Sequence, residues 1–182
     1  MLKIATFGVR GFLLLFGAVV LGLSVTLAKQ QVIGSPPSET SFGSFIGAFG
    51  ILISLIGFGA LFFDRIPALA IMVLDGLASV MYLAGAIALT VALKSVPNCT
   101  DTDNFNQYQR YYNKLLNGGC IEVDGELGCP GADDNDGGLR SRCQRVQADY
   151  VFQYLAFVFG IAVIVMSFVV HRSGGSRTAA YV

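Results

Sequence analysis

The chain has 182 residues, of which 54% are hydrophobic and 13% are charged, and its formal net charge is zero. Soluble domains carry about 25% charged residues, so the composition excludes an ordinary soluble protein and indicates a membrane protein. The zero net charge gives no basis for binding nucleic acid, and no basic run has aromatic residues interleaved with it.

Four apolar runs are long enough to cross a bilayer as helices, which takes about 20 residues each. They cover residues 7–28, 42–63, 66–93 and 150–170. The first run is longer than the roughly 7–15 apolar residues of a signal peptide, which favours a retained span over a cleaved signal. Asp64–Pro67 predicts a tight hairpin between the second and third spans. The sequence therefore predicts an all-α fold, a four-helix transmembrane bundle with a long loop at residues 94–149 and a short tail at residues 173–182.

All four cysteines lie in the 94–149 loop: Cys99, Cys120, Cys129 and Cys143. An even number confined to one loop is typical of two disulfides in an oxidising compartment. Free thiols in the cytosol and a zinc site are the alternatives, although the spacing lacks the C-x₂-C pairs of common structural zinc sites. Of the three pairings we favour Cys99–Cys143, which would join the ends of the loop, with Cys120–Cys129 inside it. The loop is therefore expected to be extracellular, with both termini cytoplasmic.

Three further patterns lie in this loop. Asn98 opens a glycosylation sequon, Asn-Cys-Thr, but we expect it to stay unmodified because it follows the third span so closely. Residues 104–116 predict a short helix with Tyr and Leu facing the membrane surface. Asp133, Asp134 and Asp136 cluster without the alternating ligand spacing of a calcium loop. We interpret them as a solvated turn, and no metal is expected.

Small residues form stripes along the predicted spans. On the second span they recur at every third or fourth position, and on the fourth span a shorter stripe follows the same rule: Thr40, Gly43, Gly47, Gly50, Ser54 and Gly57, and then Ala156, Gly160 and Ser167. Helices in lipid associate by close packing over small residues. These faces therefore predict packing within the bundle, with a dimerisation seam along the second span as the alternative.

One carboxylate, Asp75, lies well inside the third span, where a charge is costly and needs a partner. Arg10 enters the first span from the same predicted side, and a guanidinium can bind a carboxylate through two hydrogen bonds. Ser79 and Tyr82 share the helix face of Asp75. We expect a structural ion pair between Arg10 and Asp75. The alternatives are a protonated Asp75 and a small proton-coupled transporter or channel that uses Asp75, although transporters usually show several ionisable groups or broken helices.

This layout of four spans and a cysteine-bearing last loop resembles the MARVEL-domain membrane proteins, with one such domain over residues 1–172. Arg10, the pair Leu74–Asp75 and the segment Arg142–Ala148 are similar to the fungal non-classical export protein family over about residues 10–170. The longer loop, with four cysteines, departs from that family.

The resemblance implies a multi-pass plasma-membrane protein that is not an enzyme and needs no cofactor. It would organise membrane domains associated with eisosomes, respond to sphingolipids and take part in protein sorting or export. Its partners would be membrane lipids, sphingolipid or sterol among them, other membrane proteins and further copies of itself. The residues agree with a non-enzymatic role, because the single histidine, His171, lies at the opposite predicted side from the thiols.

Overall fold

A computed structural model describes residues 2–60, 68–123, 125–132 and 135–173 of the chain. Four of its helices are long and apolar enough to cross a membrane: α1 (Leu2–Lys29), α2 (Ser38–Ala60), α3 (Ala68–Leu93) and α5 (Asn135–Ser173). The predicted all-α four-helix transmembrane bundle is confirmed. The helix α4 (Asn104–Tyr112) and a two-stranded antiparallel hairpin, β1 (Ile121–Val123) and β2 (Glu126–Gly128), lie between α3 and α5 in the chain.

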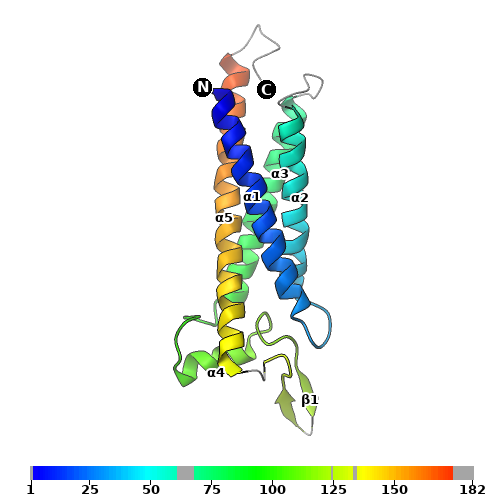
Figure 1. Ribbon diagram of the computed structural model, residues 1–182, viewed down its shortest axis with the longest axis vertical. Coiled ribbons are helices and arrows are strands. Elements are labelled where there is room, and N and C mark those ends of the chain that lie inside the picture. Colours follow the sequence, from blue (N-terminus) through cyan, green and yellow to red (C-terminus); the bar gives the residue numbers. More distant parts are fainter. Residues whose placement is uncertain (1, 61–67, 124, 133–134, 174–182) are drawn as a thin grey trace.

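The four long helices run side by side along the length of the molecule (Figure 1), and their contacts close a ring. Helix α1 packs against α2 and α5, and α3 packs against the same two helices, so α1 and α3 occupy opposite corners. The start of α1 and the end of α5 lie at one end of the bundle, which we call the terminal end, and α4 and the hairpin lie at the other, which we call the loop end. The predicted hairpin at Asp64–Pro67, and the parts of the second and third spans at residues 61–63 and 66–67, lie outside the described residues.

Helix α5 is much longer than the fourth span of residues 150–170 that hydropathy predicts. It begins at Asn135, so residues 135–149 continue the helix instead of closing the loop, and at about 1.5 Å per residue they add roughly 22 Å. Leu139, Cys143 and Val146 follow a helical spacing in this extension, and all three are buried. The charged and glycine residues between them lower the average hydropathy, which is why the extension is not visible as part of a span.

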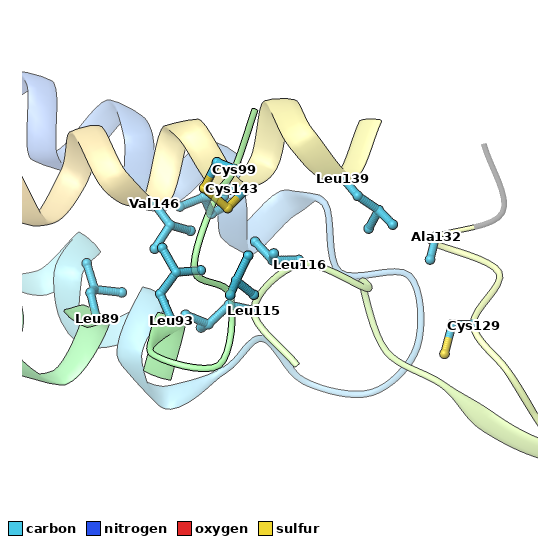
Figure 2. Packing of buried hydrophobic residues seen from close by; sticks show 12 residues of the cluster. Leu89, Leu93, Cys99, Leu115, Leu116, Cys129, Ala132, Leu139, Cys143 and Val146 are labelled. Atoms are coloured by element: carbon cyan, nitrogen blue, oxygen red, sulfur yellow. A yellow bond between two sulfur atoms is a disulfide. The ribbon is translucent and has the colours of Figure 1, made fainter. Parts of the chain in front are cut away.

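The extension of α5 builds a small hydrophobic core at the loop end (Figure 2). It combines residues from the end of α3, from the loop and from α5: Leu89, Leu93, Val96, Leu115, Leu116, Leu139 and Val146. The expected helix over residues 104–116 is confirmed as far as Tyr112 and wrong in its last four residues. Leu115 and Leu116 turn into this core instead of facing a membrane surface. Burying these two leucines against α5 is more favourable in free energy than extending α4 by a further helical turn.

Two disulfides join Cys99 to Cys143 and Cys120 to Cys129. The first ties the chain just after α3 to the extension of α5 and is part of the loop-end core, and the second closes the hairpin. These are the pairs that the positions along the loop favour, and among the described residues no cysteine is left free.

The loop end also holds the short connection between α1 and α2. The backbone amides of Val32 and Ile33 both donate to the carbonyl of Gly118, at 2.7 and 3.1 Å. Lys114 Nζ lies 2.7 Å from Glu39 Oε1 at the start of α2. The long loop therefore links both halves of the bundle and is not an independent unit.

A buried arginine organises the start of α5. Arg110 donates from Nε and Nη2 to the two carboxylate oxygens of Asp136, each at 2.9 Å, and from Nη1 and Nη2 to the carbonyls of Asn98 and Asp101. Asp136 is thus committed to an ion pair, in place of the solvated turn that the sequence suggested. Asp133 and Asp134 lie outside the described residues, and among the residues that the structure describes no group of three metal-ligating side chains comes together.

We expect the two disulfides to differ in their contribution to stability. Chain-entropy estimates give about 4 kcal/mol for a loop of 44 residues and about 3 kcal/mol for one of 9. Replacing Cys99 and Cys143 together by serine should therefore lower the thermal unfolding temperature in detergent more than replacing Cys120 and Cys129, because only the first pair ties the chain after α3 to the extension of α5, while the second closes the hairpin. An equal loss for both double variants would contradict this role.

Candidate functional site

The centre of the bundle contains polar side chains that are almost completely buried. They come from all four long helices, with α2 contributing one serine and a glycine-rich face: Arg10, Ser24, Ser54, Asp75, Ser79, Tyr82, Asp149 and Gln153. We call this set the polar core. Because lipid cannot hydrogen-bond to such groups, they must find partners inside the protein.

The strongest contact of the polar core joins Arg10 to Asp75. Arg10 Nη2 donates to Asp75 Oδ2 at 2.9 Å and Nη1 donates to Oδ1 at 3.3 Å, with both side chains 4% exposed. Their helices, α1 and α3, lie at opposite corners, so the guanidinium crosses the centre of the bundle. Gly57 on α2 makes this crossing possible, because a methyl group there would overlap the guanidinium.

Tyr82 crosses the centre in the opposite direction. Its hydroxyl reaches from α3 to Gly50 on α2, where a methyl group would overlap it, and to Gly17 on α1, where a methyl group would lie 3.1 Å away. The side chain is 3% exposed. Among the described residues the hydroxyl oxygen has no hydrogen-bond partner.

A second polar group lies nearer the loop end. Ser24 on α1 donates to Asp149 Oδ2 at 2.5 Å, and Gln153 Nε2 donates to Asp149 Oδ1 at 3.0 Å. Glycines again face the polar side chains, since a methyl group on Gly43 would overlap Ser24 and one on Gly85 would overlap Gln153. Sequence reasoning missed this group because it placed Asp149 in the loop. The i, i+4 spacing of Asp149 and Gln153, continued by the small Ala156, is the signal that could have found it.

The remaining small residues of the predicted stripes also pack within the chain. Gly47 lies against the backbone of Leu21 on α1, and Gly160 on α5 faces Ser79, whose hydroxyl donates to the carbonyl of Asp75 at 2.7 Å. Thr40, Gly43, Gly47, Gly50, Ser54 and Gly57 are all buried. Ala156 is buried as well, and Ser167 is half-buried. The small face of α2 is therefore covered by the other helices of the same chain and is not open to a second copy.

One other candidate lies away from the polar core. Asn98 is exposed at the loop end, and its side-chain oxygen accepts hydrogen bonds from the amide and hydroxyl of Thr100, both at 2.9 Å. The side chain of His171 lies outside the described residues. The structure therefore brings Arg10 and Asp75 together, while Asn98 stands apart from them.

The outward faces of the long helices carry large apolar side chains. Examples occur on each of the four: Phe12, Leu52, Val80 and Val158, each more than half exposed. A charged pair inside and apolar side chains outside are what a bilayer requires of a multi-pass protein.

These features define a multi-pass membrane protein whose helices associate through a polar centre. The model of one family, MARVEL, described as a membrane-associating domain, matches residues 3–168, and the chain belongs to this family. No curated protein and no solved structure matches the chain significantly.

Replacing Gly57 by alanine tests how the ion pair is accommodated. The added methyl group would displace the Arg10 guanidinium, and breaking a buried ion pair costs about 3–5 kcal/mol. We expect Gly57→Ala to lower the unfolding free energy by that order, measured by denaturant titration in mixed micelles.

Gly22 on α1 is the matched control, because it is exposed and no atom lies where its methyl group would go. Alanine is the better helix former by about 1 kcal/mol, so Gly22→Ala should be neutral or stabilising. Equal losses for the two variants would show that glycine is needed for a reason other than the guanidinium.

Proposed function

We propose that the protein is a non-enzymatic organiser of plasma-membrane domains that takes part in protein sorting or export. In this role it spans the membrane with both termini in the cytoplasm and the disulfide-bearing loop outside. Membership of the MARVEL family supports a membrane-associating role. The two disulfides support an oxidising environment for the loop, since such bonds persist outside the cytosol.

The observation that carries this proposal is the contrast between the charged pair buried inside the bundle and the apolar side chains on its outer surface. Arg10 and Asp75 are the only Arg, Lys, Asp or Glu residues in the predicted spans, and each is used by the other. The further buried carboxylate that the structure adds, Asp149, accepts hydrogen bonds from Ser24 and Gln153. The side chains directed outward are apolar, so lipid and other membrane helices are the surroundings that this surface fits. A protein that acts through contacts with lipids and neighbouring helices needs this arrangement and needs no catalytic group.

The finer assignment rests on the resemblance to the fungal non-classical export proteins at Arg10, Leu74–Asp75 and Arg142–Ala148. It adds association with eisosome-like domains, a response to sphingolipids, and lipid partners that include sphingolipid or sterol. Homo-oligomers would form through the outward faces, because the small face of α2 is already covered.

We expect the full chain, carrying a fluorescent tag and expressed in fungal cells, to form stable patches in the plasma membrane. Inhibiting sphingolipid synthesis should disperse these patches, because the proposed partners would be lost, and fluorescence microscopy with photobleaching recovery measures both effects. A tagged four-span protein of another family is the control. A uniform distribution that does not change on inhibition would contradict the proposal.

A small proton-coupled transporter or channel that uses Asp75 is the competing function, and the burial of carboxylates in the polar core, Asp75 and Asp149, is the observation that favours it. Proteoliposomes containing an entrapped pH indicator separate the two functions. The organiser proposal expects no proton flux above that of empty liposomes. A flux that Asp75→Asn abolishes in a correctly folded protein would support the transporter instead.

A further inference from the structure

A small cavity lies in the middle of the bundle, beside the ion pair. Its volume is about 20 Å³. Polar side chains from α2 and α3 line one part of it, and small residues of α2 and α5 line another: Ser54, Asp75, Ser79 and Tyr82, and Gly50 and Gly160. On the same measure a water molecule needs about 10–15 Å³, so the cavity has room for one.

Apolar side chains, Leu13 and Ile53 among them, form much of the wall of the cavity, but the wall also carries a polar group without a partner. Tyr82 is 3% exposed, and its hydroxyl has no hydrogen-bond partner among the described residues. A phenol hydroxyl can both donate and accept. Buried polar groups of this kind are normally satisfied by protein atoms or by an ordered water.

Asp75 supplies a second partner for such a water. An ionised carboxylate offers about four lone-pair sites, and Arg10 uses two of them. The Ser79 hydroxyl donates to the backbone carbonyl of Asp75, which leaves its oxygen able to accept. A water held by Tyr82, Asp75 and one serine would have the two to four polar partners that buried waters usually show.

We propose that this cavity is a binding site for a single structural water molecule that links Tyr82 to the Arg10–Asp75 pair. The water extends the ion pair into a polar chain that runs from Arg10 to Tyr82 and ends there. Further toward the loop end the centre is apolar, because Val20 on α1 and Ile46 on α2 are both fully buried between Tyr82 and the group of Ser24, Asp149 and Gln153. The water therefore stabilises one buried charge pair and is not part of a path across the membrane.

Radiolytic hydroxyl-radical labelling in water enriched in oxygen-18 tests this site, because radicals formed from a buried water modify the side chains next to it. The full-length protein in micelles is exposed to a short X-ray pulse, and modified residues are identified by mass spectrometry. We expect Tyr82 to incorporate the label at least several-fold more than Phe16, a buried aromatic residue of the same bundle that does not line the cavity.

Two variants make the result specific. Ala156→Val adds two methyl groups to the wall of the cavity and should remove the labelling of Tyr82. Leu155→Val, a neighbouring position that is exposed on the outer face of α5, should leave it unchanged. If Ala156→Val fails to fold, ordered density in the cavity of an experimental structure of the unmodified protein provides the independent measurement.

Labelling of Tyr82 at the level of Phe16, or a cavity without density, would overturn the proposal. Labelling that also reaches Val20 and Ile46 would overturn its second part, because it would place water in the apolar layer and connect the two polar groups.

Discussion

The fold depends on the ion pair that one arginine and one carboxylate form inside a bundle that lipid surrounds. Arg10 and Asp75 lie on helices at opposite corners of the ring, so their contact at 2.9 Å fixes the distance across the bundle and the register of α1 against α3. An uncompensated charge in a membrane is costly, and so any arrangement that separates the pair is strongly disfavoured. The main effect of the pair is therefore to select one packing of the four helices, and its contribution to the affinity between them is secondary.

Glycines on the facing helices provide the space that the buried polar side chains need. Arg10, Tyr82, Ser24 and Gln153 each extend toward a glycine on a facing helix, at Gly57, Gly50, Gly43 and Gly85 respectively. A hydrophobic driving force between helices is missing in lipid, and close packing together with hydrogen bonds takes its place. In this protein the same positions provide both, because the space that glycine leaves is filled by a polar side chain. At the loop end, where water is present, the bundle is closed instead by a hydrophobic core and a disulfide.

The sequence predicted the parts of the structure that follow from the spacing of residues along one helix or from the free-energy cost of one buried charge. Apolar runs located the four helices, the three-to-four-residue spacing identified the packed face of α2, and the cost of Asp75 pointed to Arg10 as its partner. Contacts that depend on the tertiary arrangement were not visible. The apolar side chains in the extension of α5, residues 135–149, pack against the loop that covers it, so this helical pattern is recognised only when the position of the loop is known. Asp149 could be paired with Ser24 only once that extension was known.

The most direct test of this account is a double-mutant cycle on the ion pair in lipid bicelles, with Arg10→Gln, Asp75→Asn and the double variant compared by their free energies of unfolding. Each single variant leaves one buried charge without a partner and should lose about 3–5 kcal/mol. The double variant leaves no charge, so it should lose clearly less than the sum of the two, which gives a large coupling energy. Losses that simply add would contradict the claim that Arg10 and Asp75 hold the bundle together as a pair.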